Sequence, residues 1–78
     1  MKLIALNLPR DFSEQDLVEL FKVYGNVIAC DLVLDDETGS SKGFAFVEME
    51  LEQDALNAID KLHESKIKKH KIRVKSAK

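Results

Sequence analysis

The stretch "SKGFAFVEM" (residues 41–49) predicts a β-strand that carries two phenylalanines on the face away from the hydrophobic core. Successive side chains of a strand point to opposite faces of the sheet. One face of this strand is entirely apolar and consists of Ala45, Val47 and Met49. The other face combines two aromatic rings with two charges, at Lys42, Phe44, Phe46 and Glu48. This mixture suits neither a core nor an ordinary solvated surface, so the rings need another explanation.

The sequence on either side predicts three further strands and two helices. Besides 41–49, we expect strands at 2–8, 26–35 and 71–75, and helices at about 13–24 and 52–62. Pro9 ends the first strand, and Gly39 can adopt a positive φ in the polar loop before 41–49. In the last strand, Ile72 and Val74 face the core and the basic residues face outward.

Both helices are predicted from apolar residues at helical spacing. Ser13 occupies an N-cap position with Asp16 three residues later, and Phe12 and Leu17 are spaced as a hydrophobic staple. Gly25 supplies the C-terminal stop of this helix. The apolar stripe of the second helix consists of Ala55, Ala58, Ile59 and Leu62.

The resulting order is βαββαβ, which predicts an α+β, ferredoxin-like sandwich with a four-stranded antiparallel sheet. Crossovers between parallel strands are almost always right-handed, which places both helices on one face of the sheet. No further element remains to cover the other face. Phe44 and Phe46 are therefore expected on an open face, unless a partner subunit or the C-terminal tail covers them.

Length and composition fit one folded domain, 1–78, because 45% of the 78 residues are hydrophobic and 33% are charged. The chain has no apolar run near the ~18 residues of a membrane helix and no signal-peptide pattern. We therefore expect a cytoplasmic protein with no membrane partner, and a monomer. Cys30, the single cysteine, cannot form an internal disulfide, and its apolar surroundings favour a buried free thiol.

The net charge of −2 conceals a strong asymmetry. Residues 1–65 hold all 14 acidic residues and five basic ones, whereas residues 66–78 hold seven basic residues and no acid. Attraction of an anionic partner depends on local potential, so this basic end can contact an anion despite the overall charge. The alternative is a solvated tail that only keeps the protein soluble.

Exposed aromatic rings beside cations suit the binding of single-stranded nucleic acid. A nucleobase stacks on a flat ring for roughly 1 to 3 kcal/mol, while Lys or Arg holds the adjoining phosphate. Paired bases hide their faces, so single strands are the natural ligand. Phe44 and Phe46 are therefore predicted to be a stacking platform, with Lys42 at a phosphate.

These residues also resemble the RNA-recognition-motif family. "KGFAFVEM" (42–49) matches all eight positions of the family's octamer, with Met49 at the last, and "LIALNL" (3–8) resembles its hexamer. The compact chain looks like the small single-motif RNA-binding proteins found in bacteria. The resemblance implies single-stranded RNA as the partner, single-stranded DNA as a second candidate, and no cofactor. The predicted RNA-binding residues are Ile4, Leu6, Lys42, Phe44, Phe46, Lys71, Arg73 and Lys75.

The chain departs from the family pattern at several positions. Ile4 stands where the hexamer normally has an aromatic residue that stacks a base. Asp31 and Glu48 are expected on the open face, where they repel phosphates. Glu64 and Lys69 replace glycines that are usual in the loop after the second helix. We therefore expect binding that is weaker, or more tolerant of sequence, than in a fully aromatic member.

Other functions find less support in the sequence. His63 and His70 are seven residues apart with no cysteine nearby, which favours surface histidines over a metal site. The same topology occurs in small acyl-phosphate hydrolases, for which Asn7 and Arg10 are the only candidates, so we expect no enzyme. The main alternative is a protein-binding module of the same family. The combination of Lys42 with the two rings favours RNA.

Overall fold

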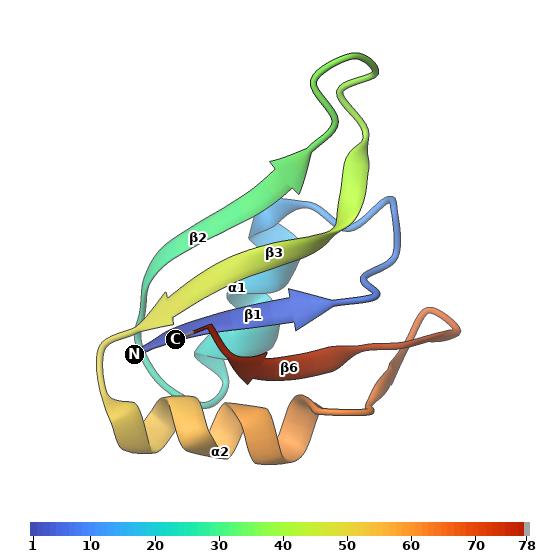
Figure 1. The fold of residues 1–78 in the computed structure, drawn as a ribbon. Helices are drawn as coiled ribbons and strands as arrows, with labels where there is room; N and C mark the ends of the chain where they lie inside the picture. The colour runs from blue at the N-terminus through green and yellow to red at the C-terminus, as the bar shows by residue number, and fades with distance from the viewer. Residues whose placement is uncertain (78) are drawn as a thin grey trace.

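The computed structural model describes residues 1–77 and confirms the βαββαβ order, with one additional hairpin. Its elements are β1 (Lys2–Leu6), α1 (Glu14–Lys22), β2 (Val27–Leu34), β3 (Ser41–Met49), α2 (Glu52–Leu62), β4 (Lys66–Ile67), β5 (His70–Lys71) and β6 (Arg73–Ser76). The main sheet has the order β2-β3-β1-β6 with antiparallel pairing throughout (Figure 1). β2 and β6 are therefore its two edges.

Both helices pack on the same face of this sheet. The buried cluster joins strand residues to α1 and α2, and contains Leu3, Ala5, Leu8, Phe12, Leu17, Phe21, Ala45, Val47, Met49, Ala55, Ala58, Leu62, Ile72 and Val74. Along β3 the buried residues alternate with exposed or half-buried ones, as the period of a strand requires. Figure 1 looks onto the face opposite α1, which no helix covers.

The start of α1 follows the predicted capping rule. The Ser13 hydroxyl accepts a hydrogen bond from the backbone N–H of Asp16 at 3.1 Å, and the Asp16 carboxylate accepts one from the Ser13 N–H at 3.0 Å. The second bond stabilises the ionised carboxylate and so lowers the pKa of Asp16. The helix ends at Lys22 with Val23 as its C-cap, and Gly25 does not have the positive φ of a glycine that stops a helix, contrary to the predicted role. A Cβ there would overlap the Asp54 side chain, so the approach of α2 requires this glycine.

The predicted boundaries were wrong at two strands. β1 ends at Leu6 rather than residue 8, because Asn7 adopts a φ of 60° and turns the chain. The predicted strand 71–75 begins at Arg73, because Lys71 belongs to β5 and pairs with β4 in a separate two-stranded sheet. The Asn7 side-chain amide donates to the Lys71 carbonyl at 2.9 Å, which fixes this hairpin beside the end of β1.

Candidate nucleic-acid interface

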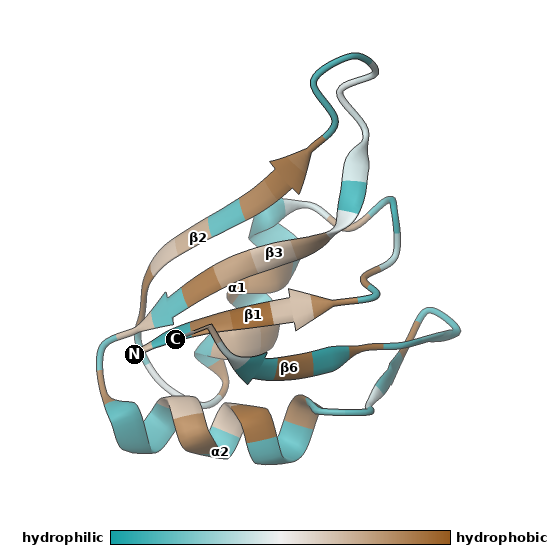
Figure 2. Cartoon of the chain, viewed as in Figure 1, coloured by the Kyte–Doolittle hydropathy of each residue, from teal (hydrophilic) through white to brown (hydrophobic). Residues whose placement is uncertain are grey.

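The uncovered face of the sheet, called the open face below, carries the residues that alternate with the core. From β1, β2, β3 and β6 it presents Ile4, Leu6, Asp31, Lys42, Phe44, Phe46, Glu48, Arg73 and Lys75. Neither phenylalanine belongs to the buried cluster, and both are half-buried. Figure 2 shows hydrophilic colouring over much of β6, against mainly apolar colouring along β1. The open face is thus apolar at its centre and charged toward its edges.

One row of residues crosses all four strands of the open face. Asp31 lies opposite Phe46, Phe46 lies opposite Ile4, and Ile4 lies opposite Lys75. Residues directly opposite have Cβ atoms about 4.5–5.5 Å apart, so neighbours in this row are within contact range. The row runs from an acid on β2, across a ring and an aliphatic side chain, to a cation on β6.

The two rings lie edge to face rather than parallel. The centroids of Phe44 and Phe46 are 6.2 Å apart, with an angle of 87° between the ring planes. The Lys2 Nζ lies 5.2 Å from the centroid of Phe46, in a cation–π contact. Sequence reasoning missed Lys2, although its position two residues before Ile4 places it on the same face of β1. A base that stacks on this side of Phe46 must displace the ammonium.

The start of β3 depends on the octamer glycine. Gly43 has a φ of 87°, which favours glycine, and its carbonyl accepts a hydrogen bond from the Leu8 N–H at 2.8 Å. The Arg10 guanidinium donates to the Ser41 carbonyl at 3.2 Å. These bonds hold β3 against the loop that follows β1. They leave Lys42 exposed at the margin of the open face.

The predicted basic residues do not form one group. Arg73 and Lys75 lie on the open face of β6, opposite Leu6 and Ile4, whereas Lys71 lies in the β4–β5 hairpin. Lys68, in the turn of the same hairpin, forms a salt bridge with Asp11 at 3.3 Å. Both side chains are exposed, so this salt bridge contributes little to stability. Lys78 lies outside the described residues.

His63 is not an ordinary surface histidine, contrary to expectation. Its side chain is half-buried, and its Nδ1 accepts a hydrogen bond from the Val74 N–H at 3.2 Å. It therefore ties the end of α2 to β6. Within residues 1–77, no group of three or more His, Cys, Asp or Glu side chains is placed to hold a metal ion.

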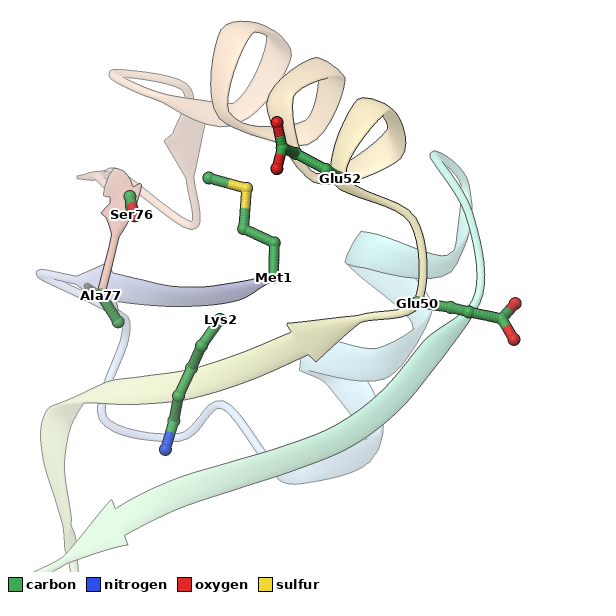
Figure 3. Close-up of a pocket in the computed structure, with 6 residues that line it drawn as sticks. All are labelled: Met1, Lys2, Glu50, Glu52, Ser76 and Ala77. Atoms are coloured by element: carbon green, nitrogen blue, oxygen red, sulfur yellow. The ribbon is translucent and has the colours of Figure 1, made fainter.

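A pocket lies where β1 begins and β6 ends. It is lined by Met1, Lys2, Glu50, Glu52, Ser76 and Ala77 (Figure 3). In Figure 3 the Glu52 side chain points toward Met1, whereas the Lys2 side chain points away from α2. This lining contains none of the eight predicted RNA-binding residues, so the candidate interface is the sheet surface and not this pocket.

The arrangement defines a βαββαβ domain with an open sheet face that carries aromatic rings and cations. Residues 6–73 match the family model of the RNA recognition motif, and the chain belongs to that family. Membership agrees with the expectation of a binding protein rather than an enzyme. As far as the structure describes the chain, no helix has the length and apolar character that crossing a membrane requires.

Relatives and solved structures share this fold. The chain is 44% identical over 68 residues to Cleavage and termination factor 1 of Schizosaccharomyces pombe, covering 87% of this chain and 19% of that protein. It is 36% identical over 75 residues to a Sex-lethal homolog of Megaselia scalaris, covering 96% of this chain and 23% of that protein. The chain thus spans about a fifth of the length of the curated relatives it matches. A crystal structure of RNA Binding Protein PG1 superimposes with a TM-score of 0.96 at 42% identity, covering 99% of this chain and 93% of that one.

Proposed function

We propose that this chain binds single-stranded RNA on the open face of its sheet. The observation that carries the proposal is the position of Phe44 and Phe46, which are half-buried and lie outside the core. Lys2 on the adjacent strand β1 lies over the Phe46 ring, and Arg73 and Lys75 lie on β6, on the far side of β1. Rings in that position do not contribute to the buried core, whereas unpaired bases can stack on them. The two phenylalanines act as the stacking surface.

The neighbouring residues supply phosphate contacts and apolar contacts. Arg73 and Lys75 on β6, Lys42 at the start of β3 and Lys71 in the hairpin contact phosphates. Ile4 and Leu6 give an apolar contact between the rings and β6. An aliphatic side chain orients a base less firmly than a ring does, so we expect moderate affinity.

The relatives support this proposal. PG1 is described as an RNA-binding protein, and the Sex-lethal protein has been solved as a complex with RNA, with a fold that matches this chain at a TM-score of 0.94 and 32% identity. We extend that ligand to this chain, with single-stranded DNA as a weaker second ligand. We also propose that residues 1–78 act as one domain, as a monomer, in the cytoplasm.

An NMR titration tests the proposal. The labelled protein is titrated with short random RNA, in separate pyrimidine-rich and purine-rich pools, and with a duplex of matched length as the control. We expect shifts on β1, β3 and β6 with the single strands, and much smaller shifts with the duplex. Shifts confined to α1 and α2, or none at all, would contradict RNA binding and favour the protein-binding alternative.

A further inference from the structure

The position of Asp31 suggests which base the open face prefers. Asp31 is the residue of β2 directly opposite Phe46, and its side chain is exposed. In the described part of the chain, its carboxylate forms no hydrogen bond or ion pair. This acid repels phosphates. An acceptor without a partner beside a stacking ring can also read the edge of the stacked base.

The row across the sheet gives a nucleotide a direction. Lys75 and Asp31 lie at its two ends, and Ile4 and Phe46 lie between them. The ends belong to the edge strands β6 and β2 (Figure 1). Three strand spacings separate the ends, about 14 Å in total. In a nucleotide the phosphate and the Watson–Crick edge of the base are at opposite ends. Lys75 attracts the phosphate and Asp31 repels it. A nucleotide across the row therefore has its phosphate near Lys75 and its Watson–Crick edge near Asp31.

The carboxylate at that end distinguishes the four bases. Ionised Asp is an acceptor only, with two oxygens. The Watson–Crick edge of unpaired guanine presents two adjacent donors, N1–H and N2–H₂, which match both oxygens in a charge-assisted pair. Adenine and cytosine present one amino donor beside a ring-nitrogen acceptor. Uracil presents one donor between two carbonyl oxygens, which repel the carboxylate.

Glu48 is the other acid near Phe46, but its surroundings differ. It lies two residues along β3 and directly opposite Lys2, whose positive charge offsets it in part. Asp31 has no cation opposite it, since its partner is the ring. Of the two acids, Asp31 is therefore the one that is both free and at the end of the row.

We propose that Asp31 makes the open face select guanine at the position stacked on Phe46. This inference rests on the proposed function, because it needs a base on that ring. It adds a specificity-determining residue to the stacking and phosphate contacts.

The test compares base preference in wild type and Asp31→Asn. The probes are single-stranded pentamers of uridine whose central nucleotide is G, A, C or U, and affinities are measured by fluorescence anisotropy at one salt concentration. General charge effects cancel in the ratio between probes. We expect wild type to bind the G probe about tenfold more tightly than the all-U probe. Asp31→Asn, whose amide replaces one acceptor oxygen by an NH₂ donor group, reduces this ratio to about twofold or less.

Two chemical probes locate the contact on the base. Replacing guanine by inosine removes the N2 amino group, and we expect wild type to lose several-fold in affinity while Asp31→Asn loses nothing further. Replacing guanine by 7-deazaguanine leaves the Watson–Crick edge unchanged and is expected to have no effect. Asp36→Asn, which makes the same charge change in the exposed loop between β2 and β3, is the matched protein control and should keep the wild-type ratio.

The outcomes separate this inference from the proposed function. If no pentamer binds, the proposed function itself is wrong. If all four bind equally, or if Asp31→Asn strengthens all four by the same factor, Asp31 only repels phosphate and the guanine proposal is overturned. If the preference for guanine survives in Asp31→Asn but disappears in Glu48→Gln, the other acid reads the base and the proposal is equally overturned.

Discussion

The two edge strands of the sheet carry opposite charges on the same face. β6 presents Arg73 and Lys75 to the open face, whereas the one charged residue of β2 is Asp31. The strands between them, β1 and β3, place apolar side chains at the centre. A strand of RNA on this face therefore meets attraction along one edge and repulsion along the other, which favours one orientation of its backbone.

The negative character of the β2 edge is visible in a neighbouring group. Partial burial, together with the nearby carboxylates of Glu14 and Asp31, raises the pKa of the Cys30 thiol to about 11, because all three oppose the charge of a thiolate. Glu14 also accepts a hydrogen bond from the Leu32 N–H at 3.3 Å, and so covers part of the backbone of this edge strand. The β2 edge is thus both acidic and partly closed, in contrast to β6.

The largest expected effect comes from removing the ring between the two edges. Phe46→Ala should lose roughly 1 to 3 kcal/mol of RNA affinity, because the stacking surface disappears while both charged edges remain. Isothermal titration with a short single strand measures this loss, and Phe44→Ala should lose an amount in the same range.

Folding distinguishes these rings from core rings. Phe46 lies outside the buried cluster, so Phe46→Ala should stay folded at room temperature, as followed by circular dichroism. The contrasting variant is Phe21→Ala. The Phe21 ring is fully buried, so its removal should lower the free energy of unfolding by about 3–5 kcal/mol. A Phe46→Ala protein that unfolds as readily as Phe21→Ala would place Phe46 in the core and refute the face assignment.

The second effect concerns the basic edge. Replacing Lys71, Arg73 and Lys75 by Gln should weaken binding for all RNA sequences and change the slope of log affinity against log salt by about two units, since each phosphate contact contributes about −0.7. Near physiological salt this amounts to about 2 kcal/mol. Because Lys71 lies apart in the hairpin, the Arg73/Lys75 double variant should account for about 1.4 units of the change.

A double variant on the helical side is the control. Lys22→Gln with Lys61→Gln changes the charge in the last turns of α1 and α2, and should leave the slope unaltered. If the β6 variants also leave the slope unaltered, the basic end is only a solvated segment.

The features that the sequence predicted well depend on local periodicity. Alternation along β3 assigns each residue to a face once the apolar set is known, and burial confirms that Ala45, Val47 and Met49 are inside. The capping box needs only Ser13 and Asp16, three residues apart, and it forms as expected. No distant part of the chain has to be known for either prediction.

The features that the sequence missed depend on distant contacts. The β4–β5 hairpin turns through Lys68 and Lys69 at φ values of 49° and 73°, where glycine or asparagine is the usual signal. Glu64, at the other position where the family has glycine, also has a positive φ of 67°. The turn geometry is therefore kept without glycine, and the Asn7 amide that holds Lys71 helps to stabilise it. The contact between Lys2 and Phe46 likewise depends on the register of β1 against β3.

A smaller effect is expected from Ile4→Tyr. Ile4 lies between Phe46 and Lys75 in the row, so a ring there supplies the stacking surface that the family normally has on β1. Binding of single-stranded RNA should tighten by up to roughly 1 kcal/mol, the low end of the stacking range, because the acidic edge is unchanged. Stability should hardly change, since Ile and Tyr have similar β-propensity.

Isothermal titration and thermal unfolding check both expectations for Ile4→Tyr. Ile4→Ala is the companion variant and should cost little affinity if the aliphatic contact is minor. Weaker binding by Ile4→Tyr than by wild type would contradict the proposed row of contacts, and would indicate that Ile4 packs against a protein partner instead.

The smallest effect concerns the ammonium that lies over Phe46. Lys2→Gln removes a cation–π contact worth about 0.5–1 kcal/mol at an exposed site, which a stacking base would otherwise have to displace. We therefore expect RNA binding to tighten by up to about twofold, ~0.4 kcal/mol, with an unchanged salt slope. Lys22→Gln makes the same charge change away from the rings and should bind as wild type does. If Lys2→Gln instead binds more weakly and the slope changes by about 0.7, Lys2 contacts a phosphate in the complex, and the attractive side of the face extends from β6 across β1.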